Sequence, residues 1–359
     1  MQIITIIGAR PQFIKAAAVS REIMQQPQIK EIFIHTGQHF DHNMSAVFFD
    51  EMQIPQPDYN LNINSLSHGA MTGKMLEKIE KILIKKKPDY VMVYGDTNST
   101  IAGALAAKKL HIKVVHVEAG LRSFNMQMPE EINRILTDRI SDVLFCPTER
   151  AVLNLKKEGY DNFNSRIIQN GDVMQDAALF FAEYSAQKSS VLKQNSLKKN
   201  HFCLCTIHRQ ENTDCYANLT AIFSALEKIN QDLPVILPLH PRTRKILTQK
   251  EIRTSVGIID PVGYFDMLEL LKYCSFVMTD SGGLQKEAFF FHKQCITMRS
   301  QTEWVELVEH SYNQIAGADT EAILKAYKKL DQQNKNFTVN LYGQGNAAAS
   351  IVKCLRTRP

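Results

Sequence analysis

The chain has 359 residues, enough for about two domains that each bury their own hydrophobic core. Hydrophobic residues make up 44% and charged residues 22% of the sequence, which excludes disordered, collagen-like and low-complexity proteins. The formal net charge is only +5, and the basic residues do not alternate with aromatic ones, so nucleic acid is not expected as a partner.

The seven cysteines are scattered and include no Cys-x-x-Cys pair, which favours reduced thiols in a cytoplasmic protein. No His/Cys cluster has the spacing of a metal site, so neither a metal nor another cofactor is expected. The apolar run that follows Met1 stops at Gly8, too short for a signal peptide or a membrane span. Membrane association is therefore not expected.

Short apolar runs alternate with longer amphipathic segments, which is typical of parallel strands joined by crossover helices. In the first half, this pattern predicts strands over residues 2–7, 31–35, 90–94, 114–117 and 143–146, and helices over 12–25 and 98–109. In the second half it predicts strands over residues 202–206, 235–239, 257–259, 276–279 and 295–298, and a helix over 217–230. The predicted fold class is α/β, with two parallel sheets.

The boundary between the two predicted domains falls near Gly171, so that residues 1–170 form the first domain and 171–345 the second. Residues 185–200, rich in Lys, Ser, Asn and Gln, are expected to form a surface loop. Two domains of this kind are expected to face each other across a central cleft. Ligands of open parallel sheets lie at the carboxyl ends of the strands, so the polar residues at those ends are the candidate site.

The first predicted strand runs into Gly8, Arg10 and Pro11, and Lys15 follows. Gly8 permits a tight turn and Pro11 suits the start of a helix, whose N-terminus attracts anions. The two cations beside it would suit a phosphate or a carboxylate. An ordinary Gly/Pro turn with solvated basic residues explains the segment about equally well.

Two carboxylates follow neighbouring predicted strands. Asp96 ends the third strand, and His116 and Glu118 lie on one face at the end of the fourth by the two-residue strand period. Asp96 could simply cap the next helix, whereas Gly120 makes a cap less natural for Glu118. A carboxylate at the end of a buried strand is costly without a partner or a function.

Two further candidates come from the segments that follow predicted strands. Glu130 lies in the first turn of a helix, where interaction with the helix dipole is sufficient to explain it. His208 and Arg209 follow the first strand of the second half, and His208 could carry a proton near neutral pH. A lone loop histidine is more often idle than catalytic.

The segment Ser281-Gly282-Gly283 joins a predicted strand directly to a helix. Its backbone N–H groups, with no Cβ in the way at the glycines, form a phosphate cradle by geometry. Glu287 lies about one turn further on and could accept hydrogen bonds from ribose hydroxyls. The chain has neither a Walker loop nor a Gly-x-Gly-x-x-Gly motif, so the segment is interpreted as a site for a nucleoside diphosphate.

Taken together, eight motifs resemble, in this order, those of the non-hydrolysing UDP-N-acetylglucosamine 2-epimerases: GARPQFIK, TGQH, GDT, HVEAGLR, PEExNR, HRxEN, TDSGGxQ and YGxG. The resemblance covers nearly the whole chain. It implies two Rossmann-like domains arranged as in B-type glycosyltransferases, with a C-terminal helical segment, residues 346–359, that returns to the first domain. It also implies a homodimer.

The resemblance implies inversion of carbon 2 of a UDP-sugar by elimination and re-addition of UDP, for surface polysaccharide biosynthesis. Carried over by motif, the catalytic residues are Asp96, Glu118, Glu130 and His208. The residues implied to bind UDP are Arg10, Lys15, His208, Arg209, Ser281, Gly282, Gly283 and Glu287. Which carboxylate serves which face of the sugar stays open.

Departures from the usual family motifs bear on the substrate. Phe40 replaces an arginine in the Gln-His-Arg motif, and Met128 replaces an aromatic residue before Pro-Glu-Glu. Such variants resemble the branch acting on UDP-2,3-diacetamido-2,3-dideoxy-glucuronate, so that sugar and UDP-N-acetylglucosamine both stay candidates. A glycosyltransferase on the same scaffold and a non-catalytic nucleotide-sugar-binding protein are the alternative functions.

Overall fold

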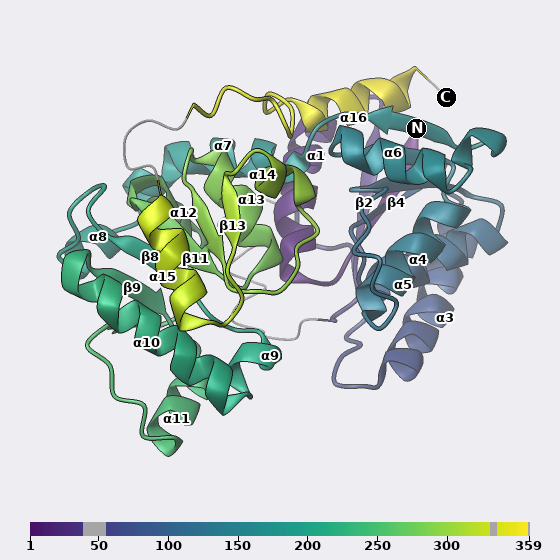
Figure 1. The fold of residues 1–359 in the computed structure, drawn as a ribbon. Coiled ribbons are helices and arrows are strands. Elements are labelled where there is room, and N and C mark those ends of the chain that lie inside the picture. Colours follow the sequence, from purple (N-terminus) through teal and green to yellow (C-terminus); the bar gives the residue numbers. More distant parts are fainter. Residues whose placement is uncertain (39–54, 331–335, 358–359) are drawn as a thin grey trace. The chain divides into compact units, whose positions relative to one another are not determined.

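The computed structural model describes residues 1–38, 55–330 and 336–357, and it divides into two compact units (Figure 1). Unit 1 comprises Met1–Ala177 and Asn340–Pro359, and unit 2 comprises Ala178–Val339. Each unit contains one parallel β-sheet flanked by helices. The predicted α/β class with two parallel sheets is confirmed.

The sheet of unit 1 has, among the described residues, seven parallel strands in the order β3-β2-β1-β4-β5-β6-β7. They are β1 (Gln2–Ile7), β2 (Lys30–His35), β3 (Tyr59–Asn60), β4 (Tyr90–Tyr94), β5 (Lys113–Val117), β6 (Val143–Cys146) and β7 (Arg166–Gln169). Five of them match the predicted strands to within one residue. The two edge strands, β3 and β7, were not predicted, because edge strands are only partly buried and lack a continuous apolar run.

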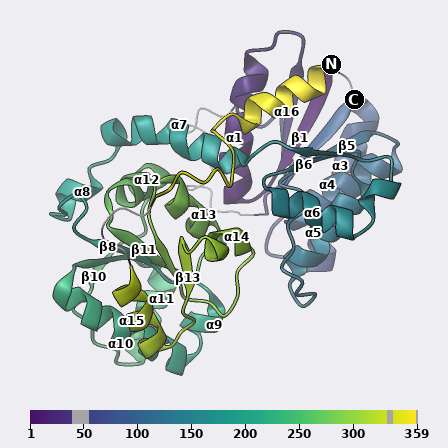
Figure 2. The ribbon, with the colours of Figure 1, turned by 45° about the horizontal axis from the view of Figure 1, so that its top comes forward.

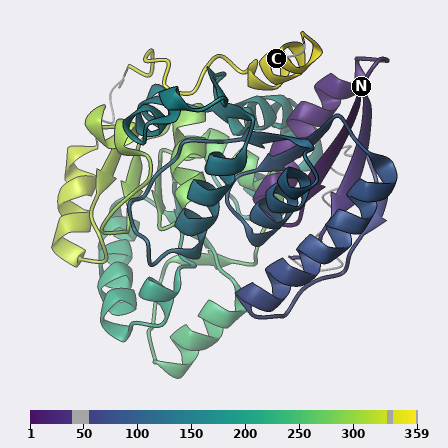
Figure 3. The same ribbon diagram turned by 90° about the vertical axis from the view of Figure 1, so that its right-hand side faces the viewer.

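The helices of unit 1 are α1 (Arg10–Met24), α3 (His68–Lys86), α4 (Asn98–Lys109), α5 (Pro129–Ile140), α6 (Glu149–Lys157), the 3₁₀ turn η1 (Tyr160–Asn162) and α16 (Ala347–Arg356). Alternate strand residues face opposite layers, as the two-residue period requires. Ile4 and Ile6 share one core with α3 and α4, which lie side by side in the blue part of Figure 3. Thr5, between them, points to the α1 side, where it meets Glu31.

The last helix, α16, returns to unit 1 and packs against α1 (Figure 2). Its buried stripe of Ala348, Ile351, Val352 and Leu355 has the spacing of one helical face. The Asp176 carboxylate accepts a hydrogen bond of 2.7 Å from the Ala348 amide and so fixes the start of the helix. Asp176 lies on α7 (Val173–Lys188), which joins unit 1 to unit 2.

Glu31 is a buried carboxylate on the α1 side of the unit 1 sheet. Burial raises its pKa to about 7, although the hydroxyls of Thr5 and Ser20 donate to it at 2.5 and 2.7 Å. An acid with a raised pKa in the folded state stabilises the fold most at low pH, and this stability is lost as the pH rises towards 7. The fold should therefore tolerate this group better when it is protonated.

Glu31→Gln should consequently become more stabilising, relative to the unchanged protein, as the pH rises. We expect the difference in the free energy of unfolding to increase by about 1–2 kcal/mol between about pH 5.5 and about pH 8. Urea unfolding followed by far-UV circular dichroism measures this difference. Glu183→Gln, at an exposed position of α7, is the control and should show no such change. A pH-independent difference for Glu31→Gln would contradict the prediction.

Unit 2 contains six described strands, again all parallel, in the order β10-β9-β8-β11-β12-β13. They are β8 (Cys203–Thr206), β9 (Val235–Pro238), β10 (Gly257–Ile259), β11 (Phe276–Thr279), β12 (Cys295–Thr297) and β13 (Asn313–Ile315). The helices are α8 (Val191–Gln194), α9 (Gln210–Thr213), α10 (Tyr216–Asp232), α11 (Pro241–Gln249), α12 (Tyr264–Tyr273), α13 (Gly282–Phe290), α14 (Val305–Glu309) and α15 (Thr320–Lys329). In Figure 1, α10 and α15 lie together over one face of the sheet.

The expectation of a surface loop over residues 185–200 is wrong for residues 185–194, whereas residues 195–200 are non-helical and mostly exposed. Helix α7 continues to Lys188, α8 follows, and Val191 is only 3% exposed in a core shared with α12. Ser185 is fully buried and donates a hydrogen bond of 2.7 Å to Glu269. The mainly polar composition of this region gave no sign of the buried residues Ser185 and Val191. A few apolar or hydrogen-bonded residues are sufficient to dock such a segment.

All seven cysteines are free thiols, and five of them are buried. Within the ranges that the structure describes, no helix is both long and apolar enough to cross a membrane.

Candidate functional site

Each sheet has a point where the strand order reverses, and the polar residues gather at these points. In unit 1 the reversal lies between β1 and β4, and in unit 2 between β8 and β11. Crossovers on either side run in opposite directions there, which leaves room for a ligand at the carboxyl ends of the strands. Asp96 follows β4, and His208 and Ser281 follow β8 and β11. The sequence therefore singled out residues at both reversal points.

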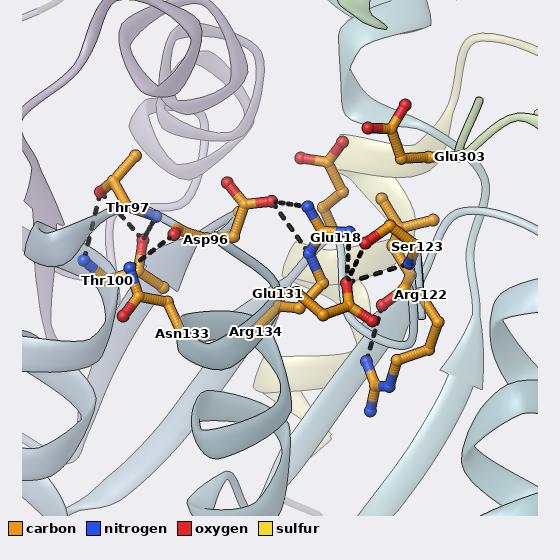
Figure 4. A network of polar contacts seen from close by, with 12 residues as sticks. Asp96, Thr97, Thr100, Glu118, Arg122, Ser123, Glu131, Asn133, Arg134 and Glu303 are labelled. Carbon is orange, nitrogen blue, oxygen red and sulfur yellow. Dashed lines mark hydrogen bonds and ion pairs between the residues drawn. The ribbon is translucent and has the colours of Figure 1, made fainter. Parts of the chain in front are cut away.

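Asp96 lies directly before α4 but does not cap it. The N-cap is Thr97, whose hydroxyl accepts from the Thr100 amide. The Asp96 carboxylate instead accepts hydrogen bonds from Nε and Nη2 of Arg134 at 3.1 and 2.6 Å (Figure 4). Its side chain is 29% exposed. The cap interpretation is thus wrong, and Asp96 is an oriented carboxylate with access to solvent.

Glu118 follows β5, next to β4, and has a left-handed backbone with φ of 73°. Such a conformation is unusual for a residue with a Cβ and is often found at functional sites. Its carboxylate forms an ion pair with Lys15 of α1, and both side chains are largely buried. The carboxylate lies beside Gly95, where an added Cβ would come within 3.5 Å of it. Glu118 is therefore held next to the residue that precedes Asp96.

The sequence placed His116 and Glu118 on one face, but their side chains serve different partners. His116 is fully buried, with Nδ1 2.7 Å from the Asp138 carboxylate and Nε2 2.7 Å from the Gly95 carbonyl oxygen. Asp138, on α5, also accepts from the Gly120 amide at 3.1 Å and from Arg122 at 2.7 Å. This buried cluster connects the two loops that carry Asp96 and Glu118.

The neighbours of Asp138 favour the charged form of its carboxyl group. Burial alone would raise the pKa of Asp138, but His116 and Arg122 outweigh it and hold that pKa below its usual range. Arg122 also makes a two-point ion pair with Glu158, with distances of 2.6 and 2.8 Å. Fully satisfied buried networks of this kind give rigidity, whereas partly satisfied ones are costly.

The helix α5 begins with two glutamates that have different environments. Glu130, the one expected from the sequence to assist catalysis, is exposed and makes no hydrogen bond or ion pair within the described parts of the chain. Glu131 is fully buried, pairs with Arg134 at 3.0 Å, and accepts from the amides of Ser123 and Phe124. Glu131 is thus part of the support of Asp96.

After β1, the backbone amides that were expected to bind an anion instead donate to the side chain of Gln12. The Gln12 amide oxygen accepts from the amides of Gly8 and Ala9 at 2.8 and 3.0 Å. Those two N–H groups are therefore already used. Lys15 contributes its charge to Glu118, as described above. Arg10 is the first residue of α1, and its side chain lies outside the described part of the structure.

In unit 2, Asp280 organises the turn that carries His208 and Arg209. It is fully buried and accepts hydrogen bonds from the amides of both residues and from Asn212, each at 3.1 Å. Burial would raise the pKa of Asp280, but these donors and the His208 ring hold it below its usual range. His208 Nδ1 lies 3.1 Å from Asp280, and its side chain is 56% exposed. The imidazole is therefore oriented and accessible.

The Ser-Gly-Gly segment opens α13 as expected. Ser281 is the N-cap and accepts from the Leu284 amide, so Gly282 and Gly283 occupy the first turn. The Trp304 indole donates to the Gly282 carbonyl at 2.9 Å, which fixes this peptide. Glu287 lies further along α13 and is 9% exposed.

A buried ion pair lies next to the first turn of α13. Arg299 pairs with Glu303 through its two terminal guanidinium nitrogens, at 3.0 and 3.1 Å. An added Cβ at Gly282 would lie 3.6 Å from Glu303 and 3.7 Å from Arg299. The pair gives the phosphate-cradle end of α13 a charged neighbour, and the sequence did not identify it.

The residues that sequence analysis missed share one property. Each acts on a residue that the sequence singled out, and each comes from a different segment of the chain. Arg134, Asp138 and Asp280 form hydrogen bonds with Asp96, His116 and His208, and Arg299 and Glu303 lie beside Gly282. Only Glu131 and Arg134, three residues apart on one helix, had a local signal. The others depend on contacts that tertiary folding brings together.

Comparison with known proteins agrees with this arrangement. The family model described as UDP-N-acetylglucosamine 2-epimerase matches residues 21–356. The chain is 53% identical to the UDP-2,3-diacetamido-2,3-dideoxy-D-glucuronate 2-epimerase of Pseudomonas aeruginosa, over 99% of both chains. It is 50% identical to a UDP-N-acetylglucosamine 2-epimerase homolog of Methanococcus maripaludis, again over 99% of both.

A solved structure confirms the fold class. The UDP-GlcNAc 2-epimerase of Methanocaldococcus jannaschii, in complex with UDP-GlcNAc and UDP, matches with a TM-score of 0.88 and 41% identity. The match covers 99% of this chain and 100% of that one. The expected pair of Rossmann-like domains of the B-type glycosyltransferase kind is therefore confirmed.

Proposed function

Because the chain belongs to the UDP-N-acetylglucosamine 2-epimerase family, we propose that it inverts carbon 2 of a UDP-N-acetylhexosamine without hydrolysing the nucleotide. The observation that carries the proposal is the pair of oriented carboxylates, Asp96 and Glu118, at the carboxyl ends of neighbouring strands. Epimerisation needs one group to remove a proton and another to return it on the opposite face. Two carboxylates with different cationic partners can fill these roles.

The proposed route is an elimination followed by re-addition. The proton on carbon 2 has no neighbouring carbonyl to acidify it, so its removal is coupled to cleavage of the bond between carbon 1 and UDP. A carboxylate of unit 1 takes the proton, the electron pair forms the carbon 1–carbon 2 double bond, and UDP leaves with the bonding pair. Protonation of carbon 2 from the other face and re-addition of UDP complete the inversion.

Most of the residues proposed to bind the nucleotide belong to unit 2. The first turn of α13, with Ser281, Gly282 and Gly283, offers backbone amides and a positive helix end to the diphosphate. His208 and Arg209 add cationic or hydrogen-bonding groups that stabilise the departing phosphate, and Glu287 serves the ribose. Arg10 and Lys15 complete the proposed diphosphate set, and Glu130 is proposed to assist proton transfer.

We propose UDP-2,3-diacetamido-2,3-dideoxy-D-glucuronate as the substrate. The support is the 53% identity to the Pseudomonas aeruginosa enzyme of that name, compared with 50% to the UDP-N-acetylglucosamine 2-epimerase homolog of Methanococcus maripaludis and 41% to the Methanocaldococcus jannaschii UDP-GlcNAc 2-epimerase. The product, its manno epimer, would enter surface polysaccharide. A homodimer in the cytoplasm is the proposed working form.

Incubation with each UDP-sugar alone in heavy water tests the function. With the diacetamido-glucuronate, proton NMR should show loss of the carbon 2 proton and growth of the manno epimer, with no acceptor added. Turnover of UDP-GlcNAc alone would replace the proposed substrate but retain the reaction. Absence of deuterium uptake from both sugars would exclude the epimerase and favour the glycosyltransferase.

A further inference from the structure

We propose that Arg134 and Glu131 are positioning residues that hold the Asp96 carboxylate in the orientation needed for proton transfer. The inference rests on the proposed function, since it assumes that Asp96 exchanges a proton with the sugar. It concerns two side chains to which neither the sequence motifs nor the comparisons give a role. Both lie on α5, one turn apart.

The guanidinium of Arg134 bridges the two carboxylates. Nε and Nη2 donate to one oxygen of Asp96 at 3.1 and 2.6 Å, and Nη1 donates to Glu131 at 3.0 Å. The Arg134 side chain is only 7% exposed, so it has little freedom to turn away. The planar fork of arginine sets both the distance and the direction of the carboxylate, which a lysine ammonium cannot do.

The position of the Arg134 guanidinium is in turn fixed by Glu131. Glu131 is fully buried, and besides Arg134 it accepts hydrogen bonds of 2.9 Å from the Ser123 amide, the Ser123 hydroxyl and the Phe124 amide. A buried carboxylate with four donors is fixed in place, because any rotation would leave a charge unsatisfied. Glu131 therefore fixes Arg134 relative to the loop of residues 121–128 (Figure 4).

A further residue of α5, Asn133, fixes the backbone of Asp96. The Asn133 side chain donates to the Asp96 carbonyl oxygen at 3.0 Å. The backbone and the carboxylate of Asp96 are thus both tied to α5, and one carboxylate oxygen is occupied by Arg134. This arrangement orients the second oxygen, which accepts no hydrogen bond from the described residues, as the one that meets the sugar.

Turnover of Arg134 variants tests the proposal. In Arg134→Lys and Arg134→Ala we expect kcat to fall by about 10²-fold, as for small displacements of catalytic groups, and KM to change less than about threefold. Millimolar guanidinium chloride should partly restore the turnover of Arg134→Ala. Arg139→Lys, the same change at an exposed position of α5, is the control and should keep its kcat within about twofold.

Glu131→Gln tests whether Glu131 holds Arg134 against the loop that contains Ser123 and Phe124. Hydrogen exchange at the Ser123 and Phe124 amides should become faster, and kcat should fall with little change in KM. In Arg134→Lys these amides should stay protected, because Glu131 is still present to accept from them. Equal exchange rates in Glu131→Gln and the unchanged protein would overturn the role of Glu131.

A measurement without turnover separates this proposal from the proposed function. The carboxyl carbon resonance of Asp96, assigned by its loss in Asp96→Asn, should shift in Arg134→Ala and stay in place in Arg139→Lys. An unchanged resonance, or a kcat of Arg134→Ala near that of the unchanged protein, would overturn the positioning role. Absence of turnover in the unchanged protein would overturn the proposed function, and the resonance would still decide the positioning of Asp96.

Discussion

Asp96→Asn should lower kcat by about 10³-fold while UDP still binds, with a dissociation constant within about threefold of the original. The substitution removes a group that can take or give a proton and keeps nearly the same shape. UDP affinity is expected to persist because most of the proposed nucleotide groups, His208 and Ser281 among them, belong to unit 2. Turnover measures the first effect and isothermal titration with UDP the second.

Asp161→Asn provides the matched control for this prediction. Asp161 is exposed in the 3₁₀ turn of unit 1, and its replacement by asparagine should leave both kcat and UDP affinity unchanged. Deuterium uptake at carbon 2 should fall in parallel with kcat in Asp96→Asn. A variant that epimerises at more than about a tenth of the original rate would show that Asp96 is not the proton-transfer group.

Asp138→Ala should lower the free energy of unfolding by about 3–5 kcal/mol, because it leaves two buried partners without their carboxylate. His116 Nδ1 and one guanidinium nitrogen of Arg122 both contact Asp138 at 2.7 Å, and both side chains are at least 99% buried. Arg122 keeps Glu158, whereas His116 loses its carboxylate. Urea unfolding followed by far-UV circular dichroism measures the loss.

The single tryptophan helps to locate the destabilisation. Trp304 lies in unit 2, so its fluorescence reports that unit, and the Asp138→Ala effect should be larger in the dichroism than in the fluorescence. Asp138→Asn keeps the shape of the side chain and should retain part of the stability. This variant replaces Asp138→Ala in the measurement if the alanine variant does not fold. Asp161→Ala is the control. A loss below about 1 kcal/mol in both Asp138 variants would contradict the role assigned to the cluster.

The sequence by itself determined the order of the main elements. Central strands such as β1, β4 and β11 are buried on both faces and read as continuous apolar runs, so their bounds could be predicted to within one residue. The edge strands β3 and β7 of unit 1 could not, because they are short and only partly buried. The helices within residues 185–194 could not either, because they dock through a few side chains such as Val191. The average composition of a segment does not show which of its few apolar residues will be buried.

For the candidate site, the sequence determined which residues stand at the strand ends, since Asp96, Glu118 and Ser281 each follow an apolar strand within two residues. Tertiary structure alone decided their partners. Lys15 reaches Glu118 across 103 residues of chain, Arg134 reaches Asp96 across 38, and Asp138 reaches His116 across 22. The hydrophobic periodicity of a strand (2.0 residues) or a helix (3.6 residues) carries no information about such pairs. The charged side chains meet only after the strands are ordered in the sheet and α1 and α5 have packed on it.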